Sequence, residues 1–163
     1  EILRCLVGSE MCIRDRTIIE VIKNKKQFLS LLLLADEQEN MIDRYLERGT
    51  MYVLNDNGVK AECVVTDECN GILEIKNIAT VPEYQGKGYA KALIDFIVKE
   101  YADKYSVLQV GTGDSPLTVP FYEKCGFVRS HIIPNFFTDN YDHPIYEDGV
   151  QLVDMIYLRS GKN

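Results

Sequence analysis

Three runs of β-type residues joined by two tight turns constrain the fold of this chain more than any other feature. The runs cover residues 51–54, 59–66 and 72–80 and are rich in β-branched side chains. The segments between them, 55–58 and 69–71, both end in Asn-Gly, a pair that is typical of turns joining antiparallel strands. The pattern therefore predicts a three-stranded antiparallel meander at the centre of the domain.

Helical spacing and further short strands surround this meander. Before it, a β-branched run is followed by two helices, the second capped by Asp36 and ended by Gly49. After it, the apolar stripe of a long helix begins near Gly86. The other predicted elements are strands at 17–22, 107–110, from 127 and near 152–158, and a short helix around 119–124. This order predicts an α/β fold in which helices cover the faces of one mixed sheet.

Length and charge restrict the classes of protein that fit. A chain of 163 residues, 46% apolar and 26% charged, is suited to one domain with an ordinary core. Its longest apolar run, residues 31–35, is far shorter than the roughly 18 residues that cross a bilayer. The net charge of -7, with scattered basic residues, disfavours nucleic acid and anionic membranes as partners. The negative net charge does not exclude a locally basic cleft for an anionic cofactor, because a bound phosphate responds mainly to nearby charges.

Cysteine and histidine are spaced unfavourably for a metal site. No CxxC pair is present, and the two histidines lie far from the cysteines along the chain: Cys5, Cys12, Cys63, Cys69, Cys125, His131 and His143. Because zinc sites use closely spaced ligands, we expect no metal. The odd number of cysteines indicates reduced thiols, and we expect a cytoplasmic protein.

The first sixteen residues differ from the rest of the chain. They show neither a hydrophobic period nor capping residues, and they lack the basic start and apolar middle of a signal peptide. We interpret residues 1–16 as a non-native or disordered extension, the alternative being a short frayed segment, and we place the functional domain at residues 17–160.

A glycine-containing loop connects the meander to the long helix. Residues 81–90 read Val-Pro-Glu-Tyr-Gln-Gly-Lys-Gly-Tyr-Ala, the end of a strand, a tight loop and a helix start. The first amides of a helix bind anions, and Gly86 and Gly88 let a pyrophosphate approach the backbone, with Lys87 able to add charge. An ordinary turn is the alternative, and neither a Rossmann nor a P-loop fingerprint is present.

Two ordered motifs resemble those of the Gcn5-related N-acetyltransferase (GNAT) superfamily. Gln85, Gly88 and Ala90 match its Gln/Arg-x-x-Gly-x-Gly/Ala motif, and residues 121–127, Phe-Tyr-Glu-Lys-Cys-Gly-Phe, match the motif that follows downstream. The resemblance implies an acyl-CoA N-acyltransferase fold, a single-domain mixed sheet with splayed central strands and flanking helices. It covers nearly all of the chain after residue 16.

The same resemblance implies acetyl-CoA as co-substrate, with no metal. Its pantetheine arm would pair with residues 78–81 where two strands splay, and amides from Gly86 to Lys91 would hold the pyrophosphate. The cofactor-binding candidates are Ile78, Ala79, Thr80, Val81, Gln85, Gly86, Lys87, Gly88, Tyr89, Ala90, Lys91 and Ser115. Ser115 and Thr118 replace the family's usual asparagine and alanine, and we favour capping of the short helix by Asp114 or Ser115 over a cofactor contact there.

The resemblance also implies two catalytic residues. Tyr122 would protonate the departing CoA thiolate, since the pKa of a phenol, about 10, is only slightly higher than the pKa of a thiol. Glu74, five positions before Ala79, stands where histone-type members carry a glutamate base. The alternatives are a core aromatic for Tyr122 and, for Glu74, a strand carboxylate that faces solvent or braces the sheet.

The acceptor is expected to be a primary amine, a small cationic molecule or a protein lysine side chain. Residues 131–148 combine aromatic rings with carboxylates, a composition that can hold an ammonium group. A surface loop packed on the sheet or on a partner in a homodimer is the alternative. A non-catalytic acyl-CoA sensor and an acetyltransferase acting on aminoacyl-tRNA are rival functions; the retained Tyr122 disfavours the first and the net charge disfavours the second.

Overall fold

The computed structural model describes residues 3–5 and 16–161, and its contacts divide the chain into two units. Unit 1 contains the residues up to Asp67 together with Ile75–Asp103, and unit 2 contains Glu68–Glu74 and the residues from Lys104 onward. The interpretation of residues 1–2 and 6–15 as an extension lies outside the described residues.

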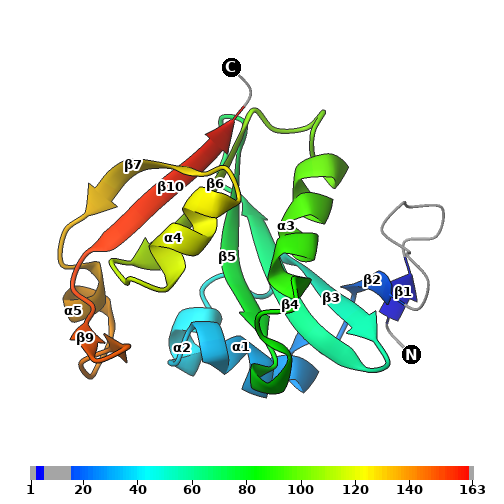
Figure 1. The fold of residues 1–163 in the computed structure, drawn as a ribbon, viewed down its shortest axis with the longest axis horizontal. Helices are drawn as coiled ribbons and strands as arrows, with labels where there is room; N and C mark the ends of the chain where they lie inside the picture. The colour runs from blue at the N-terminus through cyan, green and yellow to red at the C-terminus, as the bar shows by residue number, and fades with distance from the viewer. Residues whose placement is uncertain (1–2, 6–15, 162–163) are drawn as a thin grey trace. The chain divides into compact units, whose positions relative to one another are not determined.

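Unit 1 is built on antiparallel strands that are labelled in Figure 1. They run in the order β1 (Leu3–Cys5), β2 (Arg16–Val21), β3 (Thr50–Asp56), β4 (Val59–Asp67) and β5 (Ile72–Thr80, from Ile75 in this unit). β2 pairs antiparallel with β3, and β3 with β4. The predicted strands of the meander are therefore confirmed, and the third has the predicted bounds.

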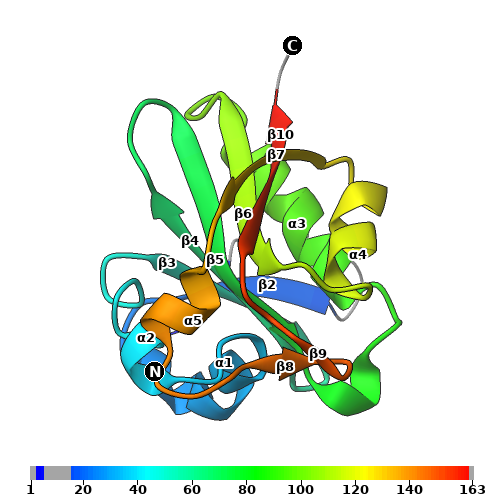
Figure 2. The ribbon, with the colours of Figure 1, turned by 90° about the vertical axis from the view of Figure 1, so that its left-hand side faces the viewer.

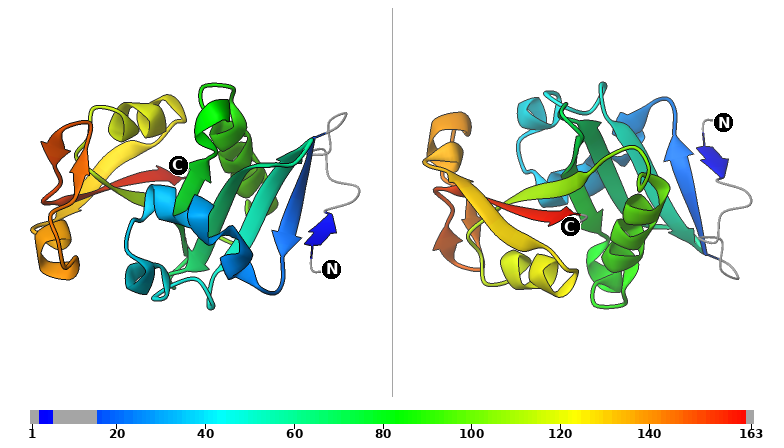
Figure 3. Two further views of the ribbon diagram at one scale, coloured as in Figure 1. Left: turned by 90° about the horizontal axis from the view of Figure 1, so that it is seen from below. Right: turned by 90° about the horizontal axis from the view of Figure 1, so that it is seen from above.

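Helices cover both faces of these strands. α1 (Leu29–Ala35), preceded by a 3-10 turn at Lys25–Phe28, and α2 (Glu39–Ile42) lie on one face, and α3 (Tyr89–Glu100) lies on the other, as Figure 3 shows. Alternation along the strands explains this, because successive side chains point to opposite faces. The first face buries Leu32, Ile42, Tyr45, Leu46, Met51, Val53 and Val64. On the other face, the ring of Tyr52 packs edge-on against Phe96 of α3.

Unit 2 has three neighbouring antiparallel strands in the order β6 (Val107–Gly113), β10 (Met155–Gly161) and β7 (Val128–Ile133). Its helices are α4 (Thr118–Lys124) and α5 (Phe136–Asn140). After α5, β8 (Tyr146–Glu147) and β9 (Val150–Gln151) form a short hairpin, which Figure 2 shows.

Three local predictions are wrong. The second helix is only one turn long and has Gln38, not Asp36, at its N-cap; Asp36 ends α1 and accepts a hydrogen bond from Tyr45 Oη at 2.9 Å. The residues from 43 to 48 keep helical turns without completing a helix. The last strand begins at Met155 rather than near 152, because Leu152 is buried in the small core beside α5.

Arg16 belongs to β2 and not to the segment before it, although the boundary of the domain itself stays a prediction. In the part of the chain that the structure describes, no helix has the length and apolar character to cross a membrane.

Candidate active site

The glycine loop has the backbone that the anion-site prediction requires. Residues Pro82–Tyr84 form a 3-10 turn, and Gly86 and Gly88 follow with φ angles of 80° and 87°. Residues other than glycine rarely adopt this left-handed region of backbone conformation. A Cβ atom added at either glycine would meet nothing within 4 Å, so the loop is open on that side. The backbone conformation, rather than crowding, therefore requires glycine here.

Gly88 is the N-cap of α3, so the helix starts directly after the open loop. The first intrahelical bond runs from Ala92 N to Gly88 O at 3.0 Å, and the amides of the first turn lack intrahelical acceptors. Lys91 directs its Nζ to Asp95 Oδ2 at 2.9 Å, which leaves its backbone amide as the part suited to an anion. The loop and helix together present the positive end of a helix dipole.

The end of β5 is tied to this loop by hydrogen bonds. Val81 N donates to Lys60 O at 2.8 Å, and Gln85 Nε2 donates to Thr80 O at 3.3 Å. Ala79 is buried, whereas Ile78 and Thr80 are half-buried. The structure thus brings the predicted pantetheine segment and the predicted pyrophosphate loop together within unit 1, and it gives Gln85 a structural contact of its own.

Three basic side chains lie beside this loop or the helix start that follows it, and only Lys87 among them was a candidate from the sequence. Lys60 Nζ stands 4.3 Å from the ring centroid of Tyr84, and Lys87 Nζ stands 5.3 Å from the same centroid. Arg16 lies over the ring of Tyr89, 4.7 Å from its centroid. Lys60 is a nearly buried lysine within an apolar strand, and that interruption was the available sequence signal.

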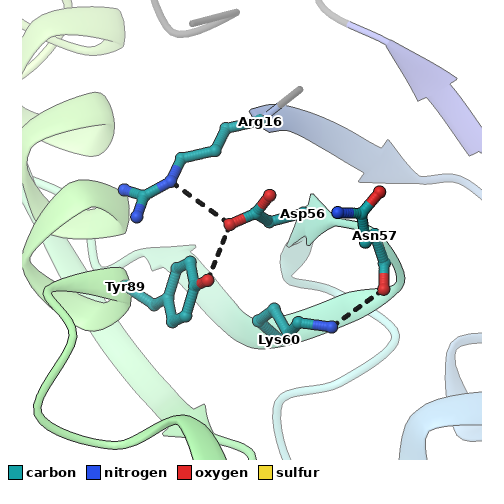
Figure 4. Close-up of polar contacts among 5 residues, drawn as sticks. All are labelled: Arg16, Asp56, Asn57, Lys60 and Tyr89. Carbon is teal, nitrogen blue, oxygen red and sulfur yellow. Dashed lines mark hydrogen bonds and ion pairs between the residues drawn. The ribbon is translucent and has the colours of Figure 1, made fainter. Parts of the chain in front are cut away.

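Asp56 links β2, β3 and the start of α3, as Figure 4 shows. Its Oδ2 accepts a hydrogen bond from Tyr89 Oη at 2.6 Å and lies 3.4 Å from Arg16 Nε. The hydrogen bond to Asp56 raises the pKa of the Tyr89 phenol. On the same hairpin, Lys60 Nζ donates to Asn57 O at 2.9 Å. These contacts hold the first residue of α3 in place.

The candidate acid Tyr122 lies in α4 of unit 2. Its side chain is buried, and its ring packs edge-on against Phe121 and Phe127, with centroid distances of 5.2 and 5.8 Å. Ser115, also buried, accepts a hydrogen bond on Oγ from Leu117 N at 3.1 Å just before α4 begins. This contact stabilises the turn that leads into α4, whose own N-cap is Leu117 without a side-chain hydrogen bond, whereas exposed Asp114 lies 3.6 Å from Arg129.

The candidate base Glu74 is buried in a different part of unit 2, among side chains of β6 and β10. Gln109 Nε2 donates to Glu74 Oε1 at 2.6 Å, and Tyr157 Oη donates to Oε2 at 3.3 Å. Arg159 Nε donates to Gln109 Oε1 at 3.0 Å and so fixes the orientation of that amide. Burial, followed by the charge of Glu74, raises the pKa of Tyr157. Both carboxylate oxygens therefore accept hydrogen bonds, which favours the alternative that Glu74 stabilises the sheet.

The aromatic residues of segment 131–148 do not form an open cage. Phe136, Phe137 and Tyr141 pack against one another beside buried Ile145 and Leu152. The acidic side chains of this segment at 139, 142 and 148 are exposed to solvent. The structure thus favours the alternative reading, a surface segment whose aromatics build a local core.

Thiols and metal ligands add no further site in the described residues. Cys63, Cys69 and Cys125 are free cysteines. Burial raises the pKa of the Cys63 thiol, which disfavours the reactive thiolate. Within residues 3–5 and 16–161, no group of three or more His, Cys, Asp or Glu side chains is arranged to hold a metal ion.

The chain has a glycine loop at a helix start and a Phe-Tyr motif on a later helix of an α/β fold. These features define an acyltransferase class, and comparisons with known proteins agree. The Acetyltransferase (GNAT) domain family matches residues 47–129. The uncharacterized N-acetyltransferase YvbK of Bacillus subtilis (strain 168) is 36% identical over 135 residues, 81% of this chain and 87% of that protein. The chain therefore belongs to the GNAT acetyltransferase family.

Solved structures show the same relationship. A GNAT family acetyltransferase from Elizabethkingia anophelis with acetyl-CoA bound is 33% identical, with a TM-score of 0.86 over 92% of this chain and 100% of that one. The IAA acetyltransferase from Bacillus cereus ATCC 14579 is 35% identical, with a TM-score of 0.82 over 90% and 99%. The predicted family, the N-acetyltransferase class and the mixed α/β fold with flanking helices are confirmed; the splay of the central strands stays a prediction.

Proposed function

We propose that the chain transfers the acetyl group of acetyl-CoA to a primary amine, either a small cationic amine or a lysine side chain. In a ternary complex, the amine nitrogen attacks the thioester carbonyl carbon, so a C–N bond forms and the C–S bond breaks. The nitrogen loses one proton and the CoA thiolate gains one. The open glycine loop at the start of α3 carries this proposal, in a chain 33% identical to an acetyltransferase with acetyl-CoA bound.

The proposed cofactor contacts follow the elements of the loop. The backbone at 78–81 pairs with the pantetheine arm, and the amides of residues 86–91 bind the pyrophosphate. Lys60 and Lys87 add positive charge beside the loop, where phosphate oxygens gain charge-assisted contacts. Ser115 stays a candidate contact, and the cytoplasm stays the expected location.

Tyr122 is the proposed general acid and Glu74 the candidate base. A buried phenol held between two aromatic rings has few rotamers, which suits a group that must meet one sulfur atom. For Glu74 the two donors at 2.6 and 3.3 Å support bracing of β5, β6 and β10 more than proton transfer.

Replacing Glu74 by glutamine tests these two roles. We expect a loss of about 1–3 kcal/mol in unfolding free energy, because buried Gln109 and Tyr157 lose a charged acceptor, and less than a tenfold change in kcat. Urea unfolding and thiol release measure the two quantities. Asp148→Asn, at an exposed carboxylate of the same unit, is the control. A fall of a hundredfold in kcat with unchanged stability would instead identify Glu74 as the base.

An acceptor panel tests the substrate class. Thiol release from acetyl-CoA is followed with butane-1,4-diamine, a lysine-containing peptide, an aminoglycoside and IAA, the last because a relative is an IAA acetyltransferase. The proposal predicts that a cationic amine gives the highest kcat/KM. Turnover of IAA alone would contradict the amine assignment and leave the acetyl donor intact.

A further inference from the structure

Two buried polar side chains of unit 1 carry hydrogen-bond acceptors without donors. Glu62 of β4 is 0% exposed and Asn77 of β5 is 3% exposed. Neither carboxylate oxygen of Glu62 has a hydrogen-bond partner, and the same holds for Asn77 Oδ1. A buried acceptor without a donor costs about 1–3 kcal/mol, and a buried charge costs more. These buried acceptors are therefore suited to a further group that donates hydrogen bonds to them.

The position of Glu62 follows from strand register. Glu62 stands opposite Val53 of β3, and cross-strand partners share a face. Val53 belongs to the apolar cluster under α1 and α2, so Glu62 points into that layer. The other members of that cluster are hydrophobic residues, among them Tyr45 with its hydroxyl group, which makes a carboxylate there exceptional.

Asn77 connects the layer that contains Glu62 to α1 through hydrogen bonds. Its Nδ2 donates to Leu32 O at 3.0 Å and to Tyr45 Oη at 3.0 Å. Tyr45 Oη in turn donates to Asp36 Oδ2 at 2.9 Å, and Asp36 is half-buried. A chain of polar groups thus leads from Asn77 toward the surface at Asp36. Burial and the carboxylates of Asp36 and Glu62 raise the pKa of Tyr45, so the phenol stays protonated in this chain.

The chemistry of the missing group follows from these atoms. When Glu62 is ionised, all three unpartnered atoms are acceptors, so a group bound between them donates hydrogen bonds. The carboxylates of Glu62 and Asp36 favour a positive charge on that group. An ammonium group supplies three N–H donors and one charge. The lysine nearest in sequence, Lys60, directs its Nζ to Asn57 O and the ring of Tyr84. The described residues offer no set of three metal ligands here.

We propose that Glu62 and Asn77 form a buried subsite that binds an ammonium group of the acceptor, with Tyr45 and Asp36 lining the approach. This inference rests on the proposed amine acetylation. Asn77 is two residues before Ala79 on the strand proposed to pair with pantetheine, so the subsite lies on the strand that holds the acetyl donor. Glu62 then selects cationic acceptors over neutral ones.

Calorimetric titration of butane-1,4-diamine into the CoA-saturated protein tests the subsite. Glu62→Gln is nearly isosteric, removes the charge and replaces one acceptor oxygen by an NH2 donor. Glu47→Gln makes the same change on an exposed carboxylate of the same layer. We expect the first variant to bind the diamine at least about tenfold more weakly, a cost of about 1.4 kcal/mol. The second variant should bind it as the wild type does.

Acetyl-CoA binding by the same three proteins separates two kinds of failure. Suppose that the wild type binds acetyl-CoA but binds the diamine no better than Glu62→Gln does. The oxygen atoms of Glu62 and Asn77 then hold a buried water only, and the proposed subsite is wrong. If the wild type does not bind acetyl-CoA, the proposed function itself fails. Equal diamine affinity in all three proteins also overturns the subsite.

Stability against pH supplies a second test. Burial raises the pKa of the Glu62 carboxyl well above its usual value of 4.5. The charge of Glu62 acts on the Tyr45 phenol, on which Asp36 also acts, and on the adjacent Cys63 thiol. A raised carboxyl pKa contributes stability below the unfolded pKa and loses it as pH rises through the folded pKa. Without ligand, Glu62→Gln should therefore be more stable than the wild type at pH 8 and nearly equal at pH 4. The diamine should raise the melting temperature of the wild type more than that of the variant, and the opposite order would refute the subsite.

Discussion

Acetyl-CoA affinity is expected to fall at least about a hundredfold when Gly88 is replaced by tryptophan, which corresponds to about 2.7 kcal/mol. Two effects add. Residue 88 has a φ of 87°, where a residue with a Cβ costs about 1–2 kcal/mol. The new side chain also fills the open space before the first amides of α3, where each charge-assisted hydrogen bond to phosphate contributes about 1.5–3 kcal/mol. Isothermal titration calorimetry measures the affinity.

Gly149→Trp is the matched control for this variant. Gly149 also has a positive φ, 76°, and a Cβ there would likewise meet nothing within 4 Å, but it lies in the β8–β9 hairpin turn. It should bind acetyl-CoA as the wild type does. Equal losses in both variants would attribute the effect to backbone strain, and wild-type affinity in Gly88→Trp would remove the loop from the cofactor site.

Tyr122→Phe is expected to lower kcat by about 100-fold or more, since positioned acid catalysis contributes about 10²–10⁴-fold. The ring keeps its packing against Phe121 and Phe127, so the fold and the affinity for acetyl-CoA should stay near wild type. The thiolate must then take its proton from water, which is not held in position to donate it. Thiol release measures kcat, and calorimetric titration measures the affinity for acetyl-CoA.

Tyr105→Phe makes the same chemical change in unit 2, at the turn before β6, outside the candidate machinery. It should retain wild-type kcat. If Tyr122→Phe also keeps wild-type kcat, Tyr122 is a core aromatic and the thiolate leaves without its help.

Local sequence signals predicted the elements whose structure is determined locally. Asn-Gly turns place β3, β4 and β5, and β5 has the predicted bounds because its two ends are a turn and a proline. The segment 131–148 could not be predicted in this way. Its α5 and its β8–β9 hairpin depend on burial of Phe137 against Ile145 and Leu152, contacts between residues distant in sequence.

The residues of the candidate site also differ in whether local sequence signals or long-range contacts determine their roles. Gly86, Gly88 and Tyr122 lie in contiguous motifs and could be selected from the sequence. Lys60, Glu62 and Asn77 could not, because their roles arise from cross-strand register and from the helices above the sheet. For Lys60 and Glu62, the sequence signal was a charged residue inside the apolar run of β4.

The central claim is acetyl transfer, and the most direct test follows the acetyl group itself. The wild-type protein is mixed with acetyl-CoA labelled with ¹³C in the acetyl group and with the best acceptor of the panel, and NMR follows the labelled carbonyl. The account predicts that the thioester signal is replaced by an amide signal in equal amount to the released thiol. A thioester that persists while bound, or that yields acetate instead of amide, would contradict it.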